Sequence, residues 1–177
     1  MSNWTFRFFS PVFLLALLLL DNQLTEMMRS FNIGGFQPVS HLFLIALMYT
    51  TLKHQWSYLF IMTLAFGIIY DSYYNGVLGI AAALFPLTAL FVYEIGETVF
   101  VNRWTRFVTV IIIVFFFDSA STLIAAVTQL ADIDFTHFVI YQLAPSLLVN
   151  ILFALLLQRP FEALYGIKKT ETGYKLT

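Results

Sequence analysis

The sequence contains no cysteine, and few of its residues carry charge. Only 11% of the 177 residues are Asp, Glu, Lys or Arg, whereas soluble domains usually have about 25%. The absence of cysteine excludes thiol catalysis, thiolate metal sites and disulfide bonds. A formal net charge of −1, without a cluster of basic residues, argues against nucleic-acid binding.

Hydrophobic residues, in contrast, make up 60% of the chain, and aromatic residues make up 18%. So few charged groups cannot cover a soluble globule of this size, and we predict an integral membrane protein surrounded by lipid. A helix that crosses a bilayer needs roughly 20 apolar residues, so six such helices would leave only short loops and tails. We therefore expect a single all-α transmembrane domain, residues 1–177, and no soluble domain.

Polar and turn-forming residues divide the chain into six apolar stretches. Their predicted bounds are about residues 8–24, 39–52, 55–70, 76–95, 106–127 and 137–158, and residues 159–177 form a short basic tail. The first stretch follows Arg7, as in a signal peptide, but no small-residue cleavage site comes after it. We therefore interpret it as an uncleaved helix, and the whole pattern predicts an integral membrane six-helix bundle.

The basic residues are distributed unevenly between the two ends of these predicted helices. If the N-terminus is cytoplasmic, Arg29 lies in an outer loop, and the other eight of the nine Lys and Arg residues lie at inner ends or in the tail. The positive-inside rule therefore predicts that both termini are cytoplasmic. Trp4, Trp56 and Trp104 all fall at predicted cytoplasmic boundaries, where indole rings are favoured.

Asp118 lies near the centre of the fifth predicted span, where an acidic residue costs about 2.5–3.5 kcal/mol on insertion scales. We therefore expect its side chain to face other helices and to be hydrogen-bonded or protonated. Ser121, Thr122 and Ala125 share its helix face. The two interpretations are an ion relay or substrate ligand, and a structural hydrogen bond between helices. We favour the second, because a proton path normally needs several acids in series.

A short polar turn connects the third and fourth predicted spans. Asp71 ends the third span, Gly67 lies one turn earlier on the same face, and Gly76 and Gly79 follow. We expect the Asp71 side chain to accept hydrogen bonds from nearby backbone N–H groups. We expect Gly79 to permit close approach of the fourth helix. A capped helical hairpin is the interpretation we favour, and a contact or ligand site on the outer side is the alternative.

The fourth and sixth spans contain further residues that are unusual in a membrane. Pro86 lies inside the fourth span and is expected to kink it. The sixth span carries one polar or small residue at every fourth position: Gln142, Ser146, Asn150 and Ala154. We favour a packing stripe that hydrogen-bonds across helices over a ligand site. Because the sequence has no Ser/His/Asp or glycine-rich phosphate motif, we expect no enzymatic activity, cofactor or metal.

The stretch from Phe66 to Gly79, FGIIYDSYYNGVLG, resembles the signature of MreD, the family of rod-shape-determining membrane proteins. That family has a Gly, an Asp four residues later, a small polar turn, and then Leu-Gly before an apolar helix. One departure is that the sixth span ends in Gln158-Arg159-Pro160 instead of a denser basic run. Further agreements are the chain length, the short basic tail, Gln37-Pro38, Asp118 and Asn150.

The resemblance implies a non-enzymatic scaffold of the machinery that synthesises peptidoglycan during cell elongation, located in the bacterial cytoplasmic membrane. It implies a fold similar to the substrate-binding subunits of energy-coupling-factor transporters, and binding to MreC, a single-span protein with an extracytoplasmic coiled coil. Other implied partners are MreB filaments, a RodA-like glycan polymerase and a class B penicillin-binding protein. The residues expected to serve partner binding or assembly are Gly67, Asp71, Gly76, Gly79, Pro86, Asp118 and Asn150.

The alternative is a vitamin-binding subunit of an energy-coupling-factor transporter, which has the same six-span size and an acidic residue after its third span. A vitamin site needs a sealed pocket with convergent polar groups, and the predicted outer loops offer few groups that would hold a ring or a phosphate. Such subunits also usually have an alanine-rich first helix, whereas Phe13–Leu20 contains one alanine in eight residues. We therefore favour the scaffold.

Overall fold

The structure is a computed structural model of the chain, and it describes residues 3–31, 34–75, 78–130, 133–170 and 173–176. Short helices α5 (Gly96–Val99) and α7 (Phe135–His137) lie between longer ones, and a two-stranded hairpin, β1 (Ile167–Thr170) and β2 (Gly173–Leu176), follows the last helix. The six longer helices are α1 (Asn3–Ser30), α2 (Leu42–Thr50), α3 (Trp56–Tyr70), α4 (Ile80–Glu94), α6 (Arg103–Val127) and α8 (Ala144–Leu164).

The structure confirms the predicted bundle of six longer α-helices. Three helical stretches of the described residues are long and apolar enough to cross a membrane: Phe9–Ser30, Arg103–Val127 and Phe135–Leu164. Two other apolar stretches, Leu42–Lys53 and Ile80–Glu94, are shorter. Composition and helix length together therefore support a location in the membrane.

Several boundaries differ from the prediction. The first span was expected to end at about residue 24, but α1 continues to Ser30. The second span was expected from residue 39, but residues 36–41 are in neither a helix nor a strand, and α2 begins at Leu42. A π-helical turn, Asp71–Asn75, prolongs α3. The tail was expected from residue 159, but α8 continues to Leu164 and the antiparallel β1–β2 hairpin follows, with Ile167 opposite Leu176. The longer α8 is explained by Phe161 and Glu162, whose side chains are buried against the bundle.

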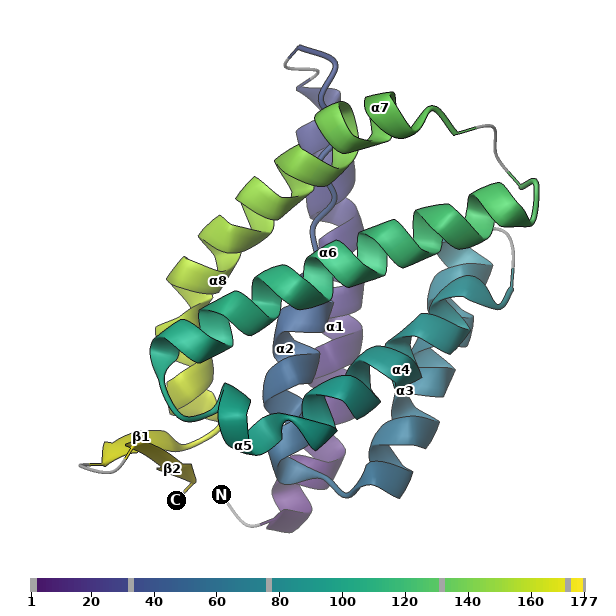
Figure 1. The fold of residues 1–177 in the computed structure, drawn as a ribbon. Coiled ribbons are helices and arrows are strands. Elements are labelled where there is room, and N and C mark those ends of the chain that lie inside the picture. The colour runs from purple at the N-terminus through teal and green to yellow at the C-terminus, as the bar shows by residue number, and fades with distance from the viewer. Residues whose placement is uncertain (1–2, 32–33, 76–77, 131–132, 171–172, 177) are drawn as a thin grey trace.

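Helix α2 forms the centre of the bundle. All nine of its residues are buried, as expected for a helix that is hydrophobic on every side. Helices α1, α4, α6 and α8 all contact it, and α3 and α4 pack along each other as an antiparallel pair. Figure 1 shows α6 crossing the bundle diagonally in front of α1 and α2. The short length of α2 therefore reflects its position inside the protein.

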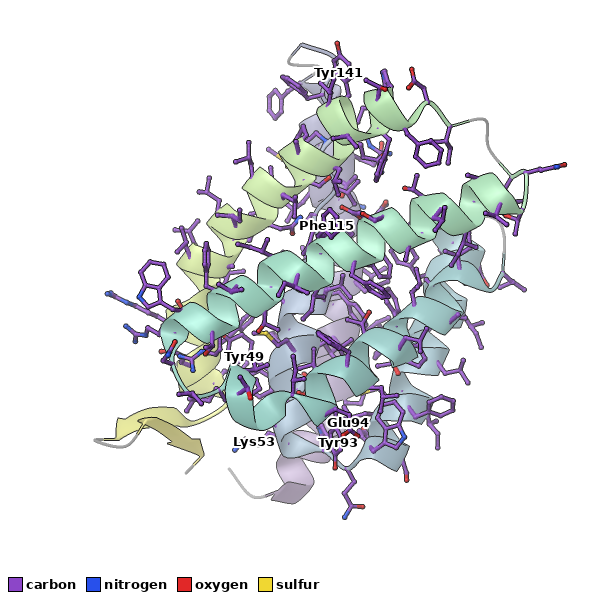
Figure 2. The ribbon with its side chains drawn as sticks, in the orientation of Figure 1. Tyr49, Lys53, Tyr93, Glu94, Phe115 and Tyr141 are labelled. Carbon is purple, nitrogen blue, oxygen red and sulfur yellow. The ribbon has the colours of Figure 1, made fainter. Side chains whose placement is uncertain are left out.

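The outer faces of the longer helices are apolar. On α6, Phe115 (labelled in Figure 2) and Phe116 are about half exposed. On α8, Leu148, Leu152 and Leu156 are exposed as well. Contiguous apolar surface of this extent is unfavourable in water, so these faces fit contact with lipid or with helices of a partner.

Two side-chain hydrogen bonds define one end of the bundle, which we call the base. Ser10 Oγ of α1 lies 2.8 Å from His54 Nε2, just after α2. Thr50 Oγ1, at the end of α2, lies 2.7 Å from the Tyr165 hydroxyl, just after α8. Burial raises the pKa of Tyr165 to about 12, so this hydroxyl stays protonated and can donate. The base also carries the β1–β2 hairpin, and the opposite end, which carries α7, is the top (Figure 1).

Candidate functional site

The non-helical segment before α2, residues 36–41, lies at the top, and side chains from other elements satisfy part of its backbone. Non-helical backbone inside a membrane protein has no helical hydrogen bonds, and each unsatisfied group in an apolar environment costs several kcal/mol. Here three consecutive N–H groups find side-chain acceptors on α1 and α8. These bonds join Val39 N to Ser146 Oγ (2.9 Å), Ser40 N to Thr25 Oγ1 (3.0 Å) and His41 N to Asn150 Oδ1 (2.8 Å).

Asn150 is the central residue of this arrangement. Its amide nitrogen donates to Val39 O at 2.7 Å and to Ser146 O at 2.8 Å, while its oxygen accepts from His41 N. Ser146, Asn150 and Ala154 are all buried on one face of α8. The predicted stripe is confirmed for Ser146 and Asn150, which hydrogen-bond across the bundle, although their partner is a non-helical segment and not a helix.

Asp21 caps α2 from a different helix. Its Oδ1 accepts hydrogen bonds from Leu42 N (2.6 Å) and Ser40 Oγ (2.5 Å), and its Oδ2 accepts from Phe43 N (2.7 Å). The first N–H groups of a helix have no partner within the helix, and a carboxylate there also interacts favourably with the helix dipole. Sequence analysis did not assign this role to Asp21.

Asp71 caps α4 in the same way from the end of α3. Its Oδ2 accepts from Gly79 N (2.8 Å) and Ala82 N (3.0 Å), and its Oδ1 accepts from Ala81 N (2.9 Å). The side chain is fully buried. The expected capped hairpin is therefore confirmed. Asp21 and Asp71 share one feature: each is an acid near the end of an apolar stretch. In both cases the N-cap residue of the following helix accepts no capping hydrogen bond with its own side chain.

The close approach of the fourth helix was predicted to depend on Gly79, but in the structure it depends on Gly67. A Cβ on Gly79 would meet no heavy atom within 4 Å, so Gly79 does not mediate a close helix contact; its φ of 121° instead requires glycine. A Cβ on Gly67 would lie 2.4 Å from the Ala82 Cα and 2.6 Å from the Ala81 oxygen. The close approach of α3 and α4 therefore depends on Gly67. Gly76 lies outside the described residues.

Asp118 faces the interior, as predicted, and is paired with a histidine. Asp118 is 4% exposed, and its Oδ1 lies 2.7 Å from His41 Nε2, while His41 is 5% exposed. The His41 ring also packs edge-on against Phe117. Asp118 Oδ2 has no hydrogen-bond partner among the residues that the structure describes. Sequence analysis missed His41, because 77 positions separate it from Asp118 and nothing local marks it as a partner.

These groups surround a polar cavity of about 440 Å³ at the top of the bundle. It extends from the buried Asp118 and His41 to exposed residues on the last turns of α1. The predicted site residues therefore lie in different places. Asp118 lines the cavity, and Asn150 hydrogen-bonds to Val39 and His41, which line it. Pro86 is buried inside α4, and the helix continues beyond it to Glu94. The remaining lining residues are Asp21, Asn22, Thr25, Glu26, Arg29, Val39, Ser40, Tyr70, Tyr73, Tyr74, Ile80, Phe117, Ser121 and Gln142.

A second polar cluster fixes α6 to α8 near the base. Glu162 of α8 accepts hydrogen bonds from Arg103 and Arg106 of α6, with Arg103 Nη2 at 2.9 Å from Glu162 Oε2. Arg106 is 1% exposed, so this is a buried ion pair. At the start of α6, Asn102 Oδ1 accepts from Thr105 N and caps the helix. Sequence analysis did not predict this cluster.

The family model described as rod shape-determining protein MreD matches residues 2–168 of the chain. The chain belongs to the MreD family. A relative, the cell shape-determining protein MreD of Streptococcus pneumoniae (strain ATCC BAA-255 / R6), is 28% identical over 156 residues, which cover 87% of this chain and 94% of the relative. No solved structure matches the chain. Membership of the MreD family supports a role in cell shape, and the family's membrane character agrees with the apolar helices described above.

Proposed function

We propose that this MreD protein is a non-enzymatic, multi-pass scaffold of the cell-elongation machinery in the bacterial cytoplasmic membrane. In this role it binds an MreC-like single-span partner that has an extracytoplasmic coiled coil. The match to the MreD family over residues 2–168 supports the proposal. The fold supports it as well. Because the described chain consists mainly of apolar helices joined by short connections, the helix faces and the two ends of the bundle are the surfaces at which it could bind a partner.

The basic residues orient the bundle in this proposal. Lys53, Arg103 and Arg159 belong to the base, whereas Arg29 belongs to the top, and Figure 2 shows Lys53 at the opposite end from Tyr141. Because basic residues concentrate on the cytoplasmic side of membrane proteins, the base is cytoplasmic and the top faces outward. Six crossings with both termini inside follow from this orientation. The outward top is then the end at which an extracytoplasmic coiled coil would meet the protein.

The α3–α4 hairpin carries the proposed contact with the partner. Tyr73 is 80% exposed and Leu78 is 68% exposed, on the two sides of the turn that Asp71 closes. Exposed aromatic and apolar side chains on a rigid support are typical anchors of protein interfaces. Gly67, Asp71 and Gly79 serve assembly by fixing this turn, and Asp118 and Asn150 by fixing the segment before α2. A role of Gly76 and Pro86 in assembly remains a prediction.

The remaining partners of the proposal follow from its orientation. MreB filaments are cytoplasmic, so they would meet the base. A RodA-like polymerase and a class B penicillin-binding protein lie in the same membrane, where the apolar outer faces of α6 and α8 are available to their helices.

Co-purification of the MreC-like partner tests the proposed contact. Replacing both Tyr73 and Leu78 by Ser removes two exposed side chains without touching the Asp71 cap. We expect partner recovery, normalised to inserted protein, to fall about tenfold, because loss of interface anchors costs at least about 1–2 kcal/mol. Tyr93→Ser is the matched control, since Tyr93 is exposed near the base. Normal recovery with the double variant would contradict the contact.

The polar cavity favours a second candidate, the vitamin-binding subunit of an energy-coupling-factor transporter. More polar groups converge on the cavity than the sequence analysis predicted for the outer loops. Depletion of the protein separates the two functions. The scaffold predicts cells that become round while vitamin uptake stays normal, whereas the transporter subunit predicts an uptake defect in cells of normal shape.

A further inference from the structure

The polar cavity at the top contains a buried acceptor that the chain itself leaves unused. Asp118 Oδ1 is paired with His41, but Asp118 Oδ2 has no partner among the described residues, although the side chain is 4% exposed and lines the cavity. Buried polar atoms in proteins are nearly always hydrogen-bonded, and an acid at membrane depth is costly. A donor from outside the chain would therefore complete this group.

The other acidic groups of the cavity are already occupied. The two oxygens of Asp21 accept from the Ser40 hydroxyl and from two backbone N–H groups at the start of α2. Glu26 is paired with Arg29 at 3.2 Å on the exposed side of the cavity. Three carboxyl groups thus face one arginine and one histidine across the whole lining. This excess of acid favours a positively charged donor over a neutral one.

Aromatic side chains line the same cavity. The rings of Tyr70 and Tyr74 lie with their centroids 5.0 Å apart, and Tyr73 and Phe117 contribute as well. Organic cations are attracted to aromatic faces within about 6 Å. The volume of about 440 Å³ lies within the usual range of small-ligand pockets. One free carboxylate oxygen and tyrosine rings in a space of this size suit an ammonium group on a small organic carrier.

We propose that this cavity binds an organic ammonium group, which donates to Asp118 Oδ2 at the buried end and packs against Tyr70 and Tyr74. A free small amine and the ethanolamine headgroup of a phospholipid share this chemistry. Arg29 near the exposed side would favour a carrier that also bears an anionic group, as a phosphoethanolamine does. The proposal goes beyond the scaffold function and does not rest on it.

Titration of the full chain, purified in detergent, tests the proposal. The probes are free ethanolamine and dihexanoyl phosphatidylethanolamine, with dihexanoyl phosphatidylglycerol as the control without an amine. We expect binding heat in calorimetry and an increase in melting temperature, and both should saturate as the amine concentration rises. Neither should be seen with phosphatidylglycerol. Similar affinity for both amines assigns the site to free amines, and binding of the lipid alone assigns it to a headgroup; both results support the ammonium chemistry.

Two variants locate the site, and a third controls for the chemistry of the substitution. Asp118→Asn keeps the shape of the side chain but removes the charge, so we expect at least about tenfold weaker binding. Ser121→Lys introduces an ammonium one helical turn from Asp118, inside the cavity, and should compete with the probe to a similar extent even if Asp118→Asn folds poorly. Asp134→Asn makes the same change at an exposed acid outside the cavity and should bind normally.

Two results would overturn the proposal. If neither amine binds the unsubstituted protein in a saturable way, water fills the cavity and donates to Asp118 Oδ2. If the amines bind Asp118→Asn or Ser121→Lys as tightly as they bind Asp134→Asn, the ammonium site lies elsewhere on the protein.

Discussion

At the scale of single residues, two aspartates organise the top of the bundle. Asp21 and Asp71 each accept three hydrogen bonds at the beginning of the helix that follows, and each comes from the preceding helix. A buried N–H group left without an acceptor costs about 1–3 kcal/mol, and in lipid no water is present to replace it. These two side chains therefore fix where α2 and α4 begin.

Gly67 and Gly79 provide a test at this scale, because their requirements for glycine differ. Gly67→Ala should destabilise the protein by about 1–3 kcal/mol, since the new methyl group would overlap the α4 backbone, which cannot move aside cheaply. Gly79→Ala should cost about 1–2 kcal/mol through its positive φ alone. Gly96→Ala is the control, because a Cβ there meets nothing within 4 Å. Thermal unfolding in detergent measures all three.

Larger side chains at positions 67 and 79 distinguish the two requirements for glycine further. A large side chain at position 79 should cost little more than alanine, because the space around Gly79 is open. A large side chain at position 67 should prevent the hairpin from closing. Equal melting temperatures for Gly67→Ala and Gly96→Ala would contradict the close packing of α3 on α4.

At the scale of elements, the Glu162 cluster joins α6 to α8, and its two arginines should contribute unequally. Glu162→Ala leaves Arg106 buried without its ion-pair partner, and breaking a buried pair from one side costs about 3–5 kcal/mol. Arg103→Ala should cost less than about 1 kcal/mol, because that side chain is 48% exposed. Limited proteolysis and melting temperature both report the difference. Equal effects of the two substitutions would show that the buried pair does not hold α6 on α8.

The sequence predicts the elements well where the signal is local. Helices α1, α3, α4, α6 and α8 coincide with apolar stretches bounded by polar residues. The Asp71 cap could be predicted because its donors are only 8 to 11 residues further along the chain. The non-helical segment before α2 could not be predicted, because its hydrogen bonds go to Thr25, Ser146 and Asn150. Apolar stretches indicate helices, but they do not reveal which distant side chains will replace helical hydrogen bonds.

The candidate site, too, could be predicted only where the signal is local in the sequence. Asp118 was identified because an acid in an apolar stretch is conspicuous, and its burial is confirmed. Its partner His41 and the cap Asp21 come from other parts of the chain, so only the fold brings them together. Gly79 was assigned the packing role that belongs to Gly67, because residue type does not distinguish a glycine needed for space from one needed for its φ.

At the scale of the whole molecule, the proposed orientation can be tested with topology reporters. A reporter fused at Asp134, between α6 and α8, should report the outer side, and one fused after Thr177 should report the cytoplasm. The reason is the concentration of Lys and Arg at the base and in the tail. Fusions before α1 and after Lys53 serve as internal controls for the cytoplasmic side. Reporters at Asp134 and Thr177 on the same side would contradict the six-span arrangement.

The central claim is that the outward α3–α4 hairpin of an MreD scaffold holds its single-span partner, and photo-crosslinking in living cells tests it most directly. A photoreactive amino acid replaces Tyr73 at the top or Trp104 at the base, since both side chains are highly exposed, at 80% and 76%. The account predicts a crosslink to the MreC-like protein from position 73 and none from position 104. No crosslink from position 73, or equal crosslinks from both, would contradict it.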